Sequence, residues 1–192
     1  MANQQPVSQG DSNLSLGFVG DFCLSGQQKN TPGALDSLMQ CCNSLNENVD
    51  LSLANFECSL IPPNHKATSM VLPDSFKQQI QQSHFDVFCL ANNHIKDHGG
   101  HILMHTISSL ADSQFKTVGA GKDLSAAQTP LIVHKKGKDI GIINVTDATH
   151  YQANAQTAGV APLCKKQISK SINQLKDQVD LIVVVLHADL EF

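Results

Sequence analysis

Four segments of the sequence carry side chains that could bind metal ions and move protons. They are residues 20–23, residues 55–57, residues 91–99, and His187 with Glu191 four positions later. Together they supply carboxylate, amide and imidazole groups, which are the donors that hold hard and borderline divalent cations. A pair of such cations a few ångströms apart can activate water and polarise a phosphoryl group. The segments therefore predict a metal site.

Each of these segments follows a short apolar run, and those runs must position the chemistry. The apolar runs are expected to be buried strands, and segments with apolar residues at helical spacing separate them, which favours an α/β fold. In open α/β sheets, ligands bind beyond the carboxyl ends of the strands, so the polar segments are expected to meet there. The expected strands are 14–19, 51–54, 87–91, 117–118, 131–133, 140–145 and 181–186, and the expected helices are 33–45, 74–83, 100–112 and 165–178.

The composition favours one globular domain preceded by a polar leader. The 192 residues, 41% of them hydrophobic, are enough to bury one core. Residues 1–13 are rich in Gln, Ser, Asn and Gly and are expected to be a disordered leader, with residues 14–192 forming the domain. The formal charge of -4 and the lack of a Lys- or Arg-rich run argue against nucleic acid as a partner.

The sequence predicts no export signal and no membrane segment in this chain. Residues 1–15 lack a charged region followed by an apolar one, and no apolar run reaches the length of about 18 residues that a bilayer requires. The six cysteines form no CxxC pair, which favours a reducing compartment. As written, the chain is expected to be cytoplasmic.

Several candidate residues also have a structural interpretation that the sequence leaves open. An Asp or Asn directly after a strand is often an Asx-turn or a helix N-cap, and Asp21 or Asn55 taken alone fits that role equally well. Cys23 is interpreted as packing rather than as a thiolate ligand. His101 and His105 are interpreted as exposed helix residues, because the two glycines before them should break any helix that reached the earlier histidines.

The same segments, in the same order, resemble the CapA-type capsule and poly-γ-glutamate synthesis proteins of the calcineurin-like metallophosphatase superfamily. The resemblance runs from about residue 16 to residue 192. Its motifs are Gly-Asp-x-x-Leu at 20–24, Asn-x-Glu at 55–57, Ala-Asn-Asn-His-x-x-Asp-x-Gly at 91–99, Val-Gly-Ala-Gly at 118–121 and His-x-x-x-Glu at 187–191. The nine-residue motif is the most specific of them. The resemblance implies a metallophosphatase-like α/β sandwich with α-β-β-α layers.

The resemblance also implies a metal centre of two divalent ions, with Mn, Fe or Zn as candidates. The residues at ligand positions are Asp21, Asn55, Glu57, Asn93 and His187. Of these, Asn55 or Glu57 stands where the superfamily has a metal-bridging carboxylate, and His187 matches the first of its late histidines.

The resemblance assigns the catalytic proton to the Asn-Asn-His segment. His94 corresponds to the acid that protonates the leaving group, and Asp97 would orient His94 or close the turn. The chain departs from the pattern at Cys23, where many metallophosphatases have the histidine of Asp-x-His. It also lacks the late Gly-His-x-His segment, so the sequence is interpreted as truncated at its carboxyl end, with one ion held less firmly.

The implied function is a metal-dependent phosphoesterase-like hydrolase of capsule or poly-γ-glutamate production. Its substrate would be a phosphoester or an anionic polymer, with other capsule-synthesis proteins as partners. Two alternatives stay open: a non-catalytic, polymer-binding factor of capsule assembly, and an inactive fragment. Relatives of this kind are often membrane-associated or exported, which is the alternative to a cytoplasmic location.

Overall fold

The computed structural model describes residues 13–24, 31–66 and 69–188, and within them two sheets pack face to face. The first sheet is parallel, with the strand order β1-β2-β5-β6. The second has the order β11-β9-β8, in which β11 runs parallel to β9 and β8 runs antiparallel to it. The strands are β1 (Leu16–Phe22), β2 (Leu51–Phe56), β5 (Val87–Cys89), β6 (Lys116–Val118), β8 (Leu131–Lys135), β9 (Lys138–Thr146) and β11 (Leu181–His187).

Side chains that alternate along the strands form the core between the two sheets. Leu51, Leu53 and Val87 on the first sheet join Ile140 and Ile142 on the second in one buried cluster. Each of these five side chains is at least 98% buried. Because successive strand residues point to opposite faces, the neighbours of these residues are available to pack outward against helices.

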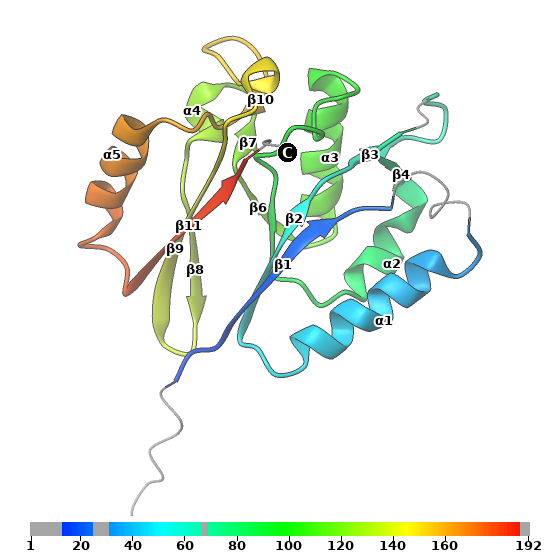
Figure 1. Cartoon of the computed structure of the whole chain (residues 1–192), viewed down its shortest axis with the longest axis horizontal. Coiled ribbons are helices and arrows are strands. Elements are labelled where there is room, and N and C mark those ends of the chain that lie inside the picture. The colour runs from blue at the N-terminus through cyan, green and yellow to red at the C-terminus, as the bar shows by residue number, and fades with distance from the viewer. Residues whose placement is uncertain (1–12, 25–30, 67–68, 189–192) are drawn as a thin grey trace, which may run out of the picture.

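Helices cover both outer faces of the sandwich (Figure 1). The first sheet packs Phe22, Phe56 and Phe88 against α1 (Ala34–Asn46), α2 (Lys77–Gln81) and α3 (Gly100–Asp112). The second sheet packs Ile143 and Val145 against α5 (Lys165–Leu175). The layers are therefore α-β-β-α, and the expected fold class is confirmed. None of the helices in the described part of the chain has the length and apolar character needed to cross a bilayer.

The strand and helix predictions locate every main element, with ends that differ by a few residues. Six smaller elements were not predicted as such, and each has only two or three residues, too short to show a periodic pattern. They are β3 (Ser59–Ile61), β4 (Val71–Pro73), β7 (Ala120–Gly121), β10 (Gly159–Val160) and the 3-10 turns η2 (Asp74–Phe76) and η3 (Thr149–Tyr151). The short helix α4 (Leu124–Ala127) follows β7. The expected leader, apart from Asn13, lies outside the described residues.

One buried amide, Asn144 on β9, joins the two sheets just below the strand ends. Its Oδ1 accepts a hydrogen bond of 2.7 Å from the backbone N–H of Ala91, and its Nδ2 donates one of 3.3 Å to the carbonyl of Val185. Gly119 lies so close that an added Cβ would stand 2.1 Å from Asn144 Oδ1, and its φ of +95° also favours glycine. Asn144 therefore ties β9 of the second sheet to the segment that follows β5 in the first sheet.

Replacing Asn144 with Ala is expected to destabilise the fold by about 1–3 kcal/mol, because it leaves the buried N–H of Ala91 without an acceptor. Urea unfolding measures this change. Asn154→Ala is a comparison at an exposed amide and should cost less. Equal losses in the free energy of unfolding for the two variants would contradict a structural role for the hydrogen bonds of Asn144.

Candidate functional site

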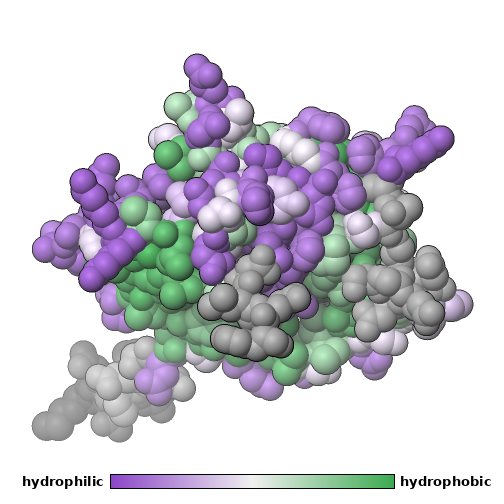
Figure 2. Space-filling view, turned by 45° about the horizontal axis from the view of Figure 1, so that its top comes forward, coloured by the Kyte–Doolittle hydropathy of each residue, from purple (hydrophilic) through white to green (hydrophobic). Residues whose placement is uncertain are grey.

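The predicted site residues lie where the two sheets come together at the carboxyl ends of their strands. Asp21 on β1 is paired with Asn55 on the neighbouring strand β2, and Glu57 directly follows β2. His187 is the last residue of β11, the edge strand of the second sheet. Seen with the top of Figure 1 brought forward, the surface over this region is mainly hydrophilic (Figure 2). The parallel topology thus brings together residues that are up to 166 positions apart, from Asp21 to His187.

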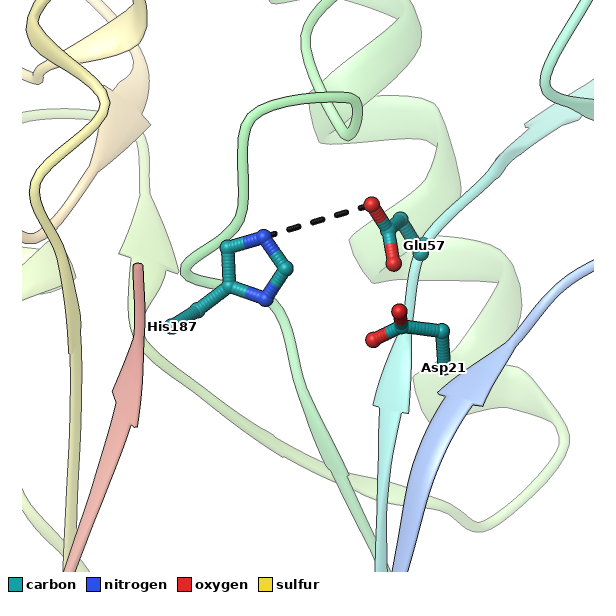
Figure 3. Close-up of side chains that lie close together, drawn as sticks. All are labelled: Asp21, Glu57 and His187. Atoms are coloured by element: carbon teal, nitrogen blue, oxygen red, sulfur yellow. Dashed lines mark ion pairs between the residues drawn. The ribbon is translucent and has the colours of Figure 1, made fainter. Parts of the chain in front are cut away.

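Asp21, Glu57 and His187 form a compact cluster of potential metal ligands (Figure 3). One ligand atom from each lies within 4.8 Å of the others, and His187 Nε2 stands 3.9 Å from Glu57 Oε1. Asp21 is exposed, Glu57 is 8% exposed and His187 is half-buried. Within the described part of the chain, no other group of three His, Cys, Asp or Glu side chains meets this spacing.

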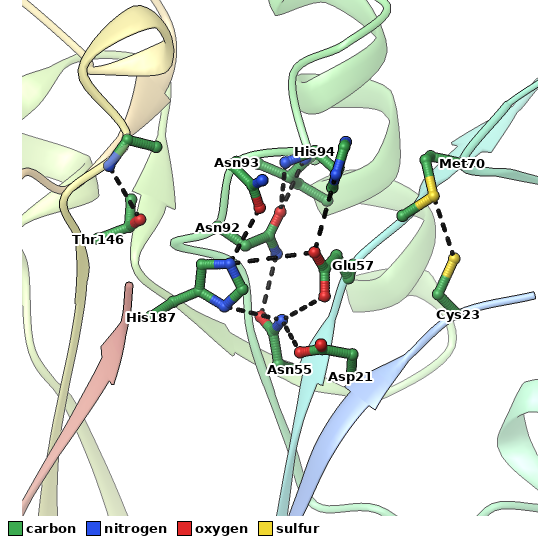
Figure 4. Close-up of polar contacts among 12 residues, drawn as sticks. Asp21, Cys23, Asn55, Glu57, Met70, Asn92, Asn93, His94, Thr146 and His187 are labelled. Carbon is green, nitrogen blue, oxygen red and sulfur yellow. Dashed lines mark hydrogen bonds and ion pairs between the residues drawn. The ribbon is translucent and has the colours of Figure 1, made fainter. Parts of the chain in front are cut away.

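The side-chain amide of Asn55 lies among these three residues (Figure 4). Its Nδ2 donates to Asp21 Oδ1 at 2.7 Å and to Glu57 Oε2 at 3.2 Å, and it stands 3.3 Å from His187 Nδ1. A polar N–H group thus lies where carboxylates and imidazole converge, which is where a cation would satisfy the same acceptors. The donor set of two carboxylates and one imidazole, with amides beside it, suits a hard or borderline divalent ion.

The pKa of Asp21 is lowered even though partial burial acts to raise it. The hydrogen bond from Asn55 and the charges of His187 and His94 act against that burial and favour the carboxylate form. Asp21 is therefore ready to bind a cation at neutral pH without first losing a proton.

Asn92 shapes the Asn-Asn-His loop, a role that the sequence analysis did not assign to it. This residue is fully buried, and its Oδ1 accepts the backbone N–H groups of His94 and Ile95 at 3.0 and 2.8 Å. Its Nδ2 donates to Asn55 Oδ1 and to the carbonyl of Phe56, both at 3.0 Å. The first Asn of the motif therefore links the loop to the end of β2. The sequence signal was an Asn two residues before a histidine in a tight turn, which is typical of an Asx-turn.

The other residues of the loop face the cluster. Asn93 Oδ1 lies 3.0 Å from His187 Nε2, so Asn93 borders the cluster of potential ligands. His94 Nδ1 lies 2.9 Å from Asp97 Oδ2, and its Nε2 lies 4.0 Å from Glu57 Oε1. The predicted pairing of His94 with Asp97 is present, and it turns Nε2 toward the cluster.

The remaining candidate residues lie outside the cluster. Cys23 Sγ contacts Met70 Sδ at 3.8 Å, as expected for packing. α3 begins at Gly100, as the glycine pair predicted, and His105 lies beside Asp74 at 3.5 Å. Glu191 lies outside the described residues.

Comparison with known proteins identifies the family. A sequence profile described as "Bacterial capsule synthesis protein PGA_cap" matches residues 15–192. The chain belongs to this family. This PGA_cap chain is 27% identical over 192 residues to the PGA biosynthesis protein CapA of Bacillus subtilis (strain 168), covering 95% of this chain and 50% of that one. It is 24% identical over 199 residues to the capsule biosynthesis protein CapA of Bacillus anthracis, covering 95% and 48%. This PGA_cap chain therefore spans about half the length of these relatives.

Solved structures place the PGA_cap chain in the calcineurin-like phosphoesterase fold. The calcineurin-like phosphoesterase YfkN from Bacillus subtilis matches with a TM-score of 0.55 at 15% identity, over 93% of this chain and 63% of that one. The NAD nucleotidase of Haemophilus influenzae matches with a TM-score of 0.59 at 16% identity, over 91% and 34%. At these identities the likeness concerns the fold. Metallophosphatase-like neighbours imply divalent metal ions, and the acidic and histidine cluster is where this chain could hold one.

Proposed function

We propose that this chain carries the metal centre of a phosphoester hydrolase that acts in capsule or poly-γ-glutamate production. The observation that carries the proposal is the cluster of Asp21, Glu57 and His187 at the carboxyl ends of strands from both sheets. The family match and the capsule-biosynthesis relatives support the biological setting. The metallophosphatase-like neighbours support the reaction type.

Each residue of the cluster has a distinct part in the proposed site. Asp21, Glu57 and His187 would hold a divalent ion, and Asn55 and Asn93 would add amide oxygens, the first after its side chain turns over. When bound, one or two such ions would supply an activated water and polarise the phosphoryl group. Asn92 keeps the loop in place by bonding both its backbone and the end of β2.

His94 is the proton donor in this proposal. Asp97 lies 2.9 Å from His94 Nδ1 and can hold the ring so that Nε2 faces the cluster. A donor at that position can protonate the oxygen that leaves phosphorus, which is the step in which a poor leaving group needs help.

The test is metal content measured together with hydrolysis of bis-p-nitrophenyl phosphate. The purified chain should bind divalent metal and turn over the diester, and Asp21→Ala should weaken metal binding by more than about 100-fold, since even supporting residues around a metal site cost 10–100-fold. Asp177→Ala, at an exposed carboxylate beyond α5, is the matched control and should behave as the unaltered chain. Equal metal binding by both variants would remove Asp21 from the site. A metal-loaded chain without turnover would favour the polymer-binding alternative.

A further inference from the structure

Three histidine side chains meet at a second place in the fold, where the Asn-Asn-His loop leads into α3. The ring centre of His65 lies 6.0 Å from that of His98 and 6.1 Å from that of His101. His65 and His98 are half-buried, and His101 is exposed. We call these three residues the histidine group. The proposed hydrolysis uses none of them.

The fold brings the histidine group together from two segments, with 33 positions between His65 and His98. β3 lies beside α3 (Figure 1), and Thr106 on that helix accepts the backbone N–H of Leu60 on β3 at 3.0 Å. A turn follows β3, in which the N–H of His65 donates to the carbonyl of Pro62 at 3.0 Å. The two later histidines lie on either side of the glycine pair at which α3 begins. The backbone around the group is therefore held by hydrogen bonds.

A hydrogen bond of His98 selects the ring nitrogen that could bind a metal ion. His98 Nε2 lies 2.9 Å from the carbonyl oxygen of Ser69. A carbonyl oxygen can only accept, so Nε2 carries the proton and donates it. In the neutral ring, Nδ1 then holds the lone pair. Histidine ligands of metal ions usually donate their second nitrogen to a carbonyl or carboxylate in this way, which fixes the orientation of the ring.

The spacing of the rings is close to that of histidines that share one ion. With metal–nitrogen bonds of about 2.1 Å and tetrahedral geometry, two bound imidazoles have their centres about 5 Å apart. The distances of 6.0 and 6.1 Å from His65 to its two neighbours exceed this value by about 1 Å. Exposed side chains change rotamer within nanoseconds, so rings that are partly exposed can close this difference around an ion.

We infer that His65, His98 and His101 form a second metal site, which takes a late first-row divalent ion such as Zn²⁺, Ni²⁺ or Cu²⁺. Imidazole nitrogen suits these ions, whereas carboxylate and amide oxygens also suit Mn²⁺ and Mg²⁺. The bound ion would tie the turn after β3 to the loop that carries His94, because His98 belongs to that loop. The inference concerns residues outside the proposed hydrolytic site and goes beyond that function.

The experiment is a calorimetric titration with Zn²⁺ and with Mn²⁺ of the chain prepared without a histidine tag. It uses Asp21→Ala as the background, so that the hydrolytic site contributes little. One equivalent of Zn²⁺ should bind, and Mn²⁺ should bind at least about tenfold more weakly. Adding His65→Ala should weaken Zn²⁺ binding at least about tenfold, because even supporting residues of a metal site cost about 10- to 100-fold. His134→Ala, at an exposed imidazole on β8, is the matched control and should leave the affinity unchanged. Equal affinities for the two histidine variants would overturn the site.

Side-chain NMR separates this inference from the proposed function. In the unaltered chain, Zn²⁺ should shift the imidazole signals of all three members of the histidine group, and these shifts should persist in Asp21→Ala. Shifts confined to His187 and His94 would place the ion in the hydrolytic site alone and overturn the second site. Zn²⁺ bound by the histidine group in a chain that hydrolyses no ester would defeat the proposed function and leave the second site standing.

Discussion

Glu57→Gln is expected to abolish metal-dependent hydrolysis while leaving the metal-free fold intact. Glu57 lies at the centre of the site: Asn55 donates to it, and His187 and His94 stand 3.9 and 4.0 Å away. The substitution keeps the size of the side chain and removes its charge. We expect metal affinity to fall by more than about 100-fold, because a ligand is lost rather than a supporting residue. Turnover should fall by at least about 1,000-fold, since the proposed reaction depends on the ion.

Melting temperatures measured with and without metal distinguish the loss of a metal ligand from the loss of the fold. Asp21 and Glu57 place two carboxylates within 4.8 Å, and without a cation those charges repel each other. The metal-free Glu57→Gln chain should therefore melt at the same temperature as the unaltered chain or slightly above it. Added metal should raise the melting temperature of the unaltered chain, by mass action on the folded state, and should not raise that of the variant. A metal-free variant that melts much lower would instead make Glu57 a structural residue.

The apolar strands and the helix-period segments between them predicted an α/β fold, and the family resemblance supplied the α-β-β-α layers. β9 and β11 are strongly apolar, and α5 shows its apolar residues at helical spacing, so period and composition agree for each. Parallel strands end at a common edge, so Asp21 and His187 could be expected together although β1 and β11 belong to different sheets. The assigned roles of these residues stay predictions until metal binding is measured.

The features that the sequence did not predict arise where distant segments meet. Asn144 lies in an apolar run that predicts only a strand, and its bond to Ala91 exists because the two sheets pack at that height. The approach of Tyr151 to Asp97 is of the same kind: it crosses 54 residues and begins in a three-residue 3-10 turn. A polar residue in a short turn has no periodic pattern to reveal its partner. Tertiary structure was required to show both contacts.

His94→Ala is expected to lower kcat by about 100- to 10,000-fold for an ester with an alkyl alcohol as leaving group, which is the usual contribution of a positioned acid or base. The reason is the position of Nε2, which faces Glu57 at 4.0 Å while Asp97 holds Nδ1 at 2.9 Å. The alkoxide that leaves phosphorus is strongly basic and needs a proton as the bond breaks. Steady-state kinetics with O-phosphoethanolamine measures the loss.

The identity of the leaving group supplies the control for this prediction. p-Nitrophenolate is weakly basic and can depart without a proton, so His94→Ala should lower its release from p-nitrophenyl phosphate far less than that of ethanolamine. Metal content should stay near that of the unaltered chain, because His94 is not among the proposed ligands. His84→Ala, at an imidazole on the turn before β5, should change neither substrate. Equal losses for both esters would mean that His94 contributes binding or metal retention and does not deliver the proton. A dependence on leaving-group basicity that becomes steeper in the variant would assign that proton to His94, because losing the donor slows the release of a basic oxygen more than that of a stable one.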